Sequence, residues 1–150
     1  LKLQVSAGAK FRATSAVLSG SSISSSERIL VADTGELHLA ATVLKNVGAV
    51  AAGPTAVVTA TNCDWSGCAQ LSCISVTGAS ATVTAANTYF HNSGTSTSGF
   101  GGAVYATAGA TVSMTDCVFR EVQAWLVGCR CCRNATHGRV FMRFDCVHCV

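Results

Sequence analysis

The stretch Gly53–Trp65 reads GPTAVVTATNCDW, and the stretch Gly78–Phe90 reads GASATVTAANTYF. The two agree at six positions when Gly53 is aligned with Gly78. Self-similarity at such a period indicates a repeat protein, because one short unit cannot bury its own apolar face and must stack on its neighbours. This repeat decides the fold, and shorter copies of it flank the pair on both sides.

The flanking copies are Gly8–Leu18 (GAKFRATSAVL), Gly35–Leu44 (GELHLAATVL) and Gly109–Phe119 (GATVSMTDCVF). Every copy ends in a large apolar residue, which we call its anchor. The anchors are Leu18, Leu44, Trp65, Phe90 and Phe119, so the interval from one copy to the next varies slightly. Five such copies predict about five stacked coils.

Aligning the copies on their anchors gives three columns of residues that we expect to face inward. Seven residues before the anchors stand Phe11, Leu37, Val58, Val83 and Val112. Five residues before them stand Ala13, Leu39, Ala60, Ala85 and Met114. Two residues before them stand Ala16, Thr42, Cys63, Thr88 and Cys117. Apolar residues with a period of two predict short strands with one buried face.

The parity of the buried positions changes between the second and third columns, so each strand must bend there. Three residues before the anchors, at this bend, stand Ser15, Ala41, Asn62, Asn87 and Asp116. Asn and Asp tolerate the left-handed conformation of a tight turn better than other residues with a side chain. A second turn is predicted two residues after the anchors, at Gly20, Asn46, Gly67, Asn92 and Glu121.

A third strand precedes the glycine that opens each copy. Its expected inward pairs are Leu3 with Val5, Leu30 with Ala32, and Val104 with Ala106, while Ile74 with Val76 is one residue out of step. Three short strands per copy, with turns aligned between copies, predict an all-β fold: a right-handed parallel β-helix of about five coils over residues 1–124. A β-sandwich or barrel would not put the same class of residue at the same turn in every copy.

The order Phe90-His91-Asn92 followed by Gly101–Val104 (GGAV) resembles the repeats of chlamydial polymorphic outer-membrane proteins. It is also similar to the wider pectate-lyase-like group of right-handed β-helix proteins. The resemblance covers roughly residues 1–124, the complete motif pair occurs once, and Ser93 stands where the family usually has asparagine. It implies a secreted or surface-displayed, adhesin-like protein. Among polysaccharide lyases and hydrolases of this fold it implies sites on the outer strand faces.

The composition agrees with an extracellular β-rich protein. Charged residues make up 11% of the chain, against about a quarter in typical globular domains. The net charge of +3 comes entirely from residues 125–150, so the coils have no basic face and we expect no nucleic-acid partner. No apolar run is long enough to predict a membrane span. The chain begins at Leu1, and we expect it to be part of a longer protein.

The seven acidic residues do not form a recognisable active site. Lyases of this fold need clustered carboxylates for calcium, and glycosidases need a carboxylate pair at a set separation. Asp64 and Asp116 are expected in different columns two coils apart, and Asp33 and Glu36 flank a turn glycine. We interpret all four as solvated turn residues.

The remaining candidate side chains have structural interpretations as well. His38 lies between two inward leucines and should point outward, and His91 should lie in the turn after Phe90. We interpret both as surface histidines. Trp65 occupies the anchor column and is expected in the core, not as a platform for a sugar. The sequence therefore predicts no catalytic residue, no cofactor and no metal site in the coils.

Nine cysteines are unusual for a chain of this length. Cys63 and Cys117 share an inward column two coils apart, which at about 9.6 Å exceeds the reach of a disulfide, so we expect buried thiols. Cys68 and Cys73 bracket a turn between coils and are the best candidates for a disulfide.

Residues 125–150 have no coil pattern and form an irregular tail rich in Cys and Arg. Its cysteines are Cys129, Cys131, Cys132, Cys146 and Cys149, which include two C-x2-C pairs with His137 between them. Four interpretations stay open: a disulfide-bonded cap, a zinc site with four thiolates, a disordered segment, or a mispredicted exon or shifted reading frame. Asn134-Ala135-Thr136 is a glycosylation sequon if this tail is secreted.

The leading functional hypothesis is a non-catalytic extracellular or cell-surface scaffold, whose flat faces contact a polysaccharide or cell-surface glycan. The alternative is a fragment of a polysaccharide lyase or glycoside hydrolase whose catalytic coils lie outside these residues. A third hypothesis, an intracellular zinc-binding protein, depends on the tail alone.

Overall fold

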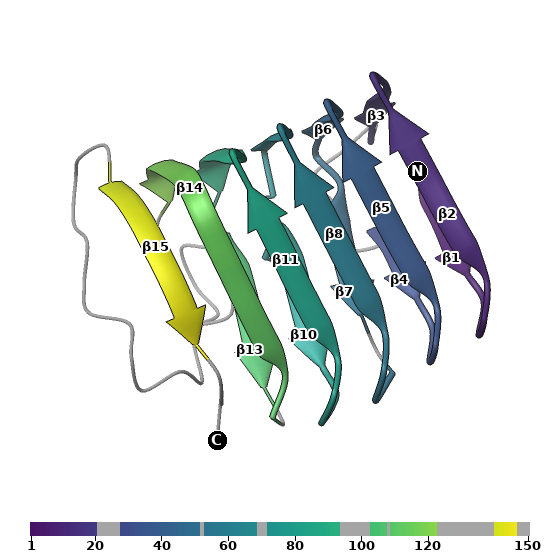
Figure 1. Ribbon diagram of the computed structural model, residues 1–150. Helices are drawn as coiled ribbons and strands as arrows, with labels where there is room; N and C mark the ends of the chain where they lie inside the picture. Colours follow the sequence, from purple (N-terminus) through teal and green to yellow (C-terminus); the bar gives the residue numbers. More distant parts are fainter. Residues whose placement is uncertain are drawn as a thin grey trace.

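The computed structural model describes residues 1–20, 28–51, 53–68, 72–93, 103–107, 109–122 and 140–146. These residues form fifteen strands, with no helix among them and therefore none that could span a membrane. The chain winds into a right-handed parallel β-solenoid of about four turns (Figure 1). Each of its three sides contains five strands, if the two halves of β14 are counted separately. The predicted fold class is confirmed.

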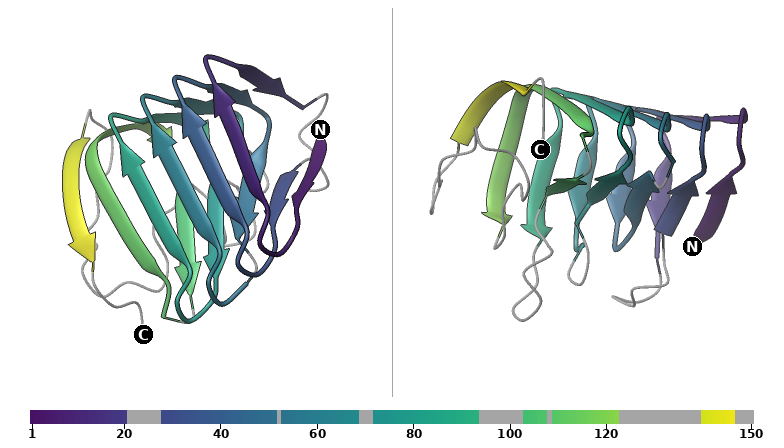
Figure 2. Two further views of the ribbon diagram at one scale, coloured as in Figure 1. Left: turned by 45° about the vertical axis from the view of Figure 1, so that its right-hand side comes forward. Right: turned by 90° about the horizontal axis from the view of Figure 1, so that it is seen from below.

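Three sides make up each coil. The first side is a parallel sheet of β1 (Lys2–Val5), β4 (Arg28–Val31), β7 (Gly48–Ala51), β10 (Ile74–Thr77) and β13 (Val104–Thr107). The second side consists of β2 (Lys10–Thr14), β5 (Glu36–Ala40), β8 (Val57–Thr61), β11 (Thr82–Ala86) and the first half of β14 (Thr111–Val122). The third side consists of β3 (Val17–Ser19), β6 (Val43–Lys45), β9 (Asp64–Ser66), β12 (Tyr89–Ser93) and the second half of β14. Because β14 continues through the bend, it joins the second and third sides into one sheet (Figure 2).

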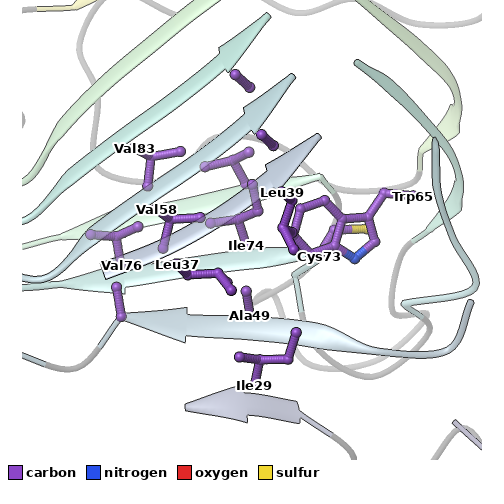
Figure 3. Close-up of a cluster of buried hydrophobic side chains, with 14 of the residues drawn as sticks. Ile29, Leu37, Leu39, Ala49, Val58, Trp65, Cys73, Ile74, Val76 and Val83 are labelled. Carbon is purple, nitrogen blue, oxygen red and sulfur yellow. The ribbon is translucent and has the colours of Figure 1, made fainter. Parts of the chain in front are cut away.

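The core lies between the sides and is built from the predicted columns. From the second coil onward, the residues seven and five places before the anchors are at most 2% exposed. Figure 3 shows Leu37, Val58 and Val83 of the second side lying close to Ile74 and Val76 of the first side. In the first coil Phe11 and Leu18 are only partly buried, because strands β2 and β3 have a described neighbour on one side only.

The bend between the second and third sides also has the predicted conformation. All five residues of this column have a left-handed φ of 48–53°: Ser15, Ala41, Asn62, Asn87 and Asp116. In the first four coils the amide group of this residue donates a hydrogen bond to the next coil, as when Ala41 donates to Thr61 O and Asn62 donates to Ala86 O. At the second turn Asn46, Gly67 and Asn92 have positive φ, whereas Glu121 lies within strand β14.

The register predicted for the third strand is wrong in the second coil. Ile29 and Val31 are fully buried there, whereas Leu30 and Ala32 are half-buried. Ile74 is also in step, since it pairs with both Ala49 and Val104. The prediction failed because it aligned the strands on the following glycine, and the glycines do not occupy equivalent places. In the second coil the left-handed position of Gly8 (φ 71°) is taken by Thr34 (φ 57°), and Gly35 comes one residue later.

The tail contributes one described element. Strand β15 (Val140–Cys146) pairs antiparallel with β14, along the C-terminal edge of the solenoid (Figure 1). The other candidate residues of the tail lie outside the described residues: Cys129, Cys131, Cys132, His137, Cys149 and the sequon at Asn134. The zinc, disulfide and reading-frame interpretations of residues 125–150 therefore stay predictions.

Candidate functional site

The outer face of the second side begins with a group of charged residues, which we call the charged half: Lys10, Arg12, Glu36 and His38. Glu36 lies at the centre, with its Oε1 atom 2.8 Å from Lys10 Nζ and its Oε2 atom 2.8 Å from His38 Nε2. Strands β2 and β5 pair Lys10 with Glu36 directly, and His38 is two residues further along β5. The hydrogen bond from Lys10, and then that from His38, holds the pKa of Glu36 below its ordinary value.

This arrangement corrects one prediction and confirms another. Glu36 was expected as a solvated turn residue, but it is the first residue of β5 and takes part in an ion-pair network. The anchor alignment puts Lys10 and Glu36 at the same outward position of neighbouring coils, but Glu36 was interpreted only from its place beside Gly35. His38 points outward as predicted and is half-buried.

The next three coils of the second side present a different surface, which we call the threonine half. Its outward positions form three rows across β8, β11 and β14: Val57, Thr82 and Thr111; Thr59, Thr84 and Ser113; and Thr61, Ala86 and Thr115. Seven of these nine side chains carry a hydroxyl group, and all nine are partly or fully exposed. Because the strands pair in register, the hydroxyl groups form a regular array.

A third polar group lies on the outer face of the third side, and we call it the Tyr-His-Asp cluster: Asp64, Tyr89, His91 and Asn92. His91 Nε2 is 2.7 Å from Asp64 Oδ1, and its other ring nitrogen, Nδ1, is 3.1 Å from Asn92 Nδ2. The Tyr89 ring stacks on the imidazole, with centroids 4.6 Å apart and an angle of 15° between the planes. Strands β9 and β12 are neighbours and pair Asp64 with Tyr89, which brings the carboxylate to the imidazole.

Asp64 and His91 both lie on the surface as predicted, but their predicted place in turns is wrong. Asp64 lies in β9 and His91 in β12, so neither is a turn residue, and each is the other's hydrogen-bond partner. The signal that could have found them is the repeat itself. When the two longest copies are aligned, Asp64 corresponds to Tyr89, and His91 is two places further on the same outward face.

The other acidic residues have local structural contacts. Asp33 is an exposed turn residue, as predicted, and its Oδ1 accepts hydrogen bonds from Thr55 N (3.3 Å) and Thr55 Oγ1 (3.0 Å) in the next coil. Asp116 occupies the bend, away from the column of Asp64. Within the described residues, no group of three or more His, Cys, Asp or Glu side chains could hold a metal ion.

Trp65 belongs to an aromatic stack inside the solenoid, as predicted. It is fully buried, its ring lies 6.0 Å from that of Phe90, and Phe90 in turn lies 5.2 Å from Phe119. The indole Nε1 donates a hydrogen bond to Val47 O at 2.6 Å. This ring is therefore unavailable to a sugar.

The cysteines of the coils are core residues. Cys63 and Cys117 are buried thiols in the predicted column, and burial raises the pKa of both. Each donates to a backbone carbonyl two residues earlier, at Thr61 and Thr115 respectively. The predicted Cys68–Cys73 disulfide is not formed, since both residues are buried thiols.

Comparison with known proteins gives no assignment. No family model matches the chain, and neither a curated protein nor a solved structure matches it. The outer faces of the coils are therefore the basis for a functional proposal.

Proposed function

We propose that this protein is a non-catalytic extracellular or cell-surface scaffold that contacts glycans through the outer faces of its coils. The observation that carries the proposal is the Tyr-His-Asp cluster. It combines an aromatic ring, a carboxylate and a side-chain amide on a flat surface, with 45% of the Asp64 side chain exposed. Rings of this kind offer apolar contact, and a carboxylate and an amide offer hydrogen bonds to hydroxyl groups.

The wider molecule supports the same proposal. The low charge, the outward threonines and the resemblance to surface-displayed β-helix proteins all fit a secreted or surface location. A solenoid suits extended ligands, because its repeated strands present a long surface with one spacing. A polysaccharide is such a ligand.

One observation favours the alternative, a fragment of a polysaccharide lyase or glycoside hydrolase. A histidine held by a carboxylate on an outer strand face is a pair that can carry a proton. The Asp64–His91 pair has this arrangement. Catalysis would need further residues, supplied by coils outside this chain.

Binding and cleavage can be measured on the same preparations. The purified chain is incubated with insoluble cellulose, chitin and cell-wall polysaccharide and with immobilised pectin and alginate, and the bound fraction is measured. We expect Tyr89→Ala and Asp64→Asn to lower binding to the preferred polymer by about tenfold, the equivalent of 1.4 kcal/mol. Tyr105→Ala is the matched control, because Tyr105 is a partly exposed tyrosine on the first side.

The controls separate the two proposals. Equal binding by Tyr89→Ala, Asp64→Asn and Tyr105→Ala would exclude the Tyr-His-Asp cluster as the glycan contact. Release of reducing ends or unsaturated uronates, with or without calcium, would contradict the non-catalytic scaffold and favour the enzyme fragment. Loss of that release in Asp64→Asn alone would assign it to the Asp64–His91 pair.

A further inference from the structure

We propose that the threonine half of the second side binds the surface of ice. This inference does not rest on the glycan proposal, because it concerns another side of the coils and another ligand. Its basis is the geometry of the hydroxyl array, the stiffness of the threonines and their absence from the equivalent positions of the third side.

The array is a nearly rectangular net. Strands β8, β11 and β14 lie side by side in register, so Thr59, Thr84 and Ser113 are direct neighbours (Figure 1). Neighbouring strands are about 4.8 Å apart, and outward residues along one strand are about 6.6 Å apart, since each residue rises about 3.3 Å. The hydroxyl groups therefore repeat at about these two distances.

The same two distances occur in a tetrahedral network of water. Hydrogen-bonded water oxygens lie about 2.75 Å apart, so two oxygens bonded to one common water lie about 4.5 Å apart. Oxygens separated by three such bonds in the extended arrangement lie about 6.9 Å apart. The threonine hydroxyls can thus take the place of lattice oxygens in both directions, with mismatches of a few tenths of an ångström.

The array is also held rigidly in place. Threonine is β-branched and has few rotamers open to it, so its hydroxyl group is already oriented before a ligand binds. Beneath the array the inward residues are at most 1% exposed, and they fix the strands from below: Val58, Ala60, Val83, Ala85, Val112 and Met114. Ice is a rigid ligand, and a preorganised surface loses little entropy on binding it.

In these coils the second side carries more outward threonines than the third side, and the first side carries Ser75 and Thr77 at outward positions. On the third side, strands β9, β12 and β14 carry at their outward positions Asp64, Ser66, Tyr89, His91, Val118 and Arg120, of which only Ser66 has an aliphatic hydroxyl group. Threonine favours strands in general, but this preference would act on both sides alike. The threonine half also contains no ionisable side chain, which would orient water around its own charge.

The test uses the whole chain and polycrystalline ice. The chain is added to a buffer from which ice grows slowly, and the fraction incorporated into the ice is measured. Crystal growth during annealing is followed in parallel. We expect the wild type to enter the ice and to slow the coarsening of crystals. Exclusion from the ice to the same extent as a small dye would overturn the proposal.

Variants locate the contact. Thr84→Tyr places a bulky ring at the centre of the array, and we expect it to raise the concentration needed to slow coarsening by at least about tenfold. Thr77→Tyr is the matched control, because Thr77 is an exposed threonine of the first side in the same coil. Equal activity of these two variants would overturn the proposal. If Thr84→Tyr does not fold by circular dichroism, Thr59→Tyr in the preceding coil replaces it.

A subtler change tests the hydroxyl group itself. Thr84→Val keeps the shape of the side chain and removes one hydrogen bond, so we expect a loss of two- to tenfold. Tyr89→Ala should leave ice binding unchanged, because Tyr89 lies on the third side. An effect of Tyr89→Ala as large as that of Thr84→Tyr would contradict the assignment to the threonine half.

Discussion

The charged half and the threonine half lie on one continuous sheet, yet they differ in chemistry. Strands β2 and β5 present Lys10, Arg12, Glu36 and His38, whereas β8, β11 and β14 present rows of hydroxyl groups. Under both halves the inward residues follow the same columns, and under both the bend has the same left-handed φ. The fold therefore constrains the inner positions in every coil and leaves the outer positions free for function.

This division follows from the geometry of a strand. Successive side chains point to opposite faces, so the residues that form the core and the residues that meet a ligand alternate along the same strand. A change at an inner position should therefore affect folding equally in either half. A change at an outer position should affect folding little and binding strongly.

The largest expected effect comes from shortening an inner residue. Leu37 is fully buried beneath the charged half, and we expect Leu37→Ala to lower the free energy of unfolding by about 2–5 kcal/mol. Val83→Ala, beneath the threonine half, should cost less only because fewer carbon atoms are removed. Urea unfolding followed by circular dichroism measures both. A negligible effect at one of the two sites would mean that the halves do not share one core.

Val83 and Thr84 are adjacent in β11, and one faces the core while the other faces outward. Valine and threonine have nearly the same shape, so exchanging them at the two positions compares the inner and outer faces. Val83→Thr buries a hydroxyl group in the core and should lower the free energy of unfolding by about 1–3 kcal/mol unless the hydroxyl finds a partner. Thr84→Val, one residue further and exposed, should change it by less than about 0.5 kcal/mol. Similar losses from the two exchanges would contradict the assignment of inner and outer faces.

The inner columns could be predicted because each column has one residue in each of the five copies of the repeat. Leu37, Val58 and Val83 share one place relative to their anchors, and the bend before each anchor holds a turn residue in most copies. Even Ala41, an unfavourable residue for a left-handed turn, was placed correctly by its column. Repetition thus compensates for the weak signal of a single strand.

The candidate surfaces could be predicted only in part. The repeat places Asp64 beside Tyr89, but it does not report the side-chain rotamers that bring the Asp64 carboxylate to His91. The register of Leu30 was missed because a glycine was used as the reference, although the left-handed position belongs to Thr34 in that coil. Turn residues vary in their place within a turn, whereas anchors are fixed by the core.

A smaller effect is expected at the bend, where Ala41 of the charged half and Asn62 of the threonine half occupy equivalent positions in neighbouring coils. Ala41 directly follows β5 in the charged half and has a φ of 48°. Asn62 directly follows β8 in the threonine half and has a φ of 53°. Because the left-handed conformation costs an alanine about 1–2 kcal/mol, Ala41→Asn should raise the free energy of unfolding by about 1 kcal/mol. Asn62→Ala should lower it by a similar amount. Changes of the same sign in the two variants would contradict a common backbone at the bend.

The smallest expected effect is a dependence on pH that belongs to the charged half alone. The pKa of Glu36 is lowered from its ordinary value of 4.5, first by the hydrogen bond from Lys10 and then by that from His38. The folded protein therefore releases this proton more readily than the unfolded chain. The resulting stabilisation is present above the unfolded pKa and is lost as the pH falls through the lower, folded pKa. Because this ion pair lies on the outer face, where water screens it, the effect on the melting temperature should be slight.

A pair of variants isolates this contribution. Glu36→Gln removes the titrating group, so the difference in melting temperature between it and the wild type should shrink as the pH is lowered from about 6 to about 3. Thr84→Val is the control from the threonine half, and its difference from the wild type should stay constant over the same range. A difference for Glu36→Gln that does not change with pH would mean that the Lys10–Glu36–His38 contacts add nothing to folding. In that case the outer residues of the charged half, like those of the threonine half, would contribute little to the stability of the coils.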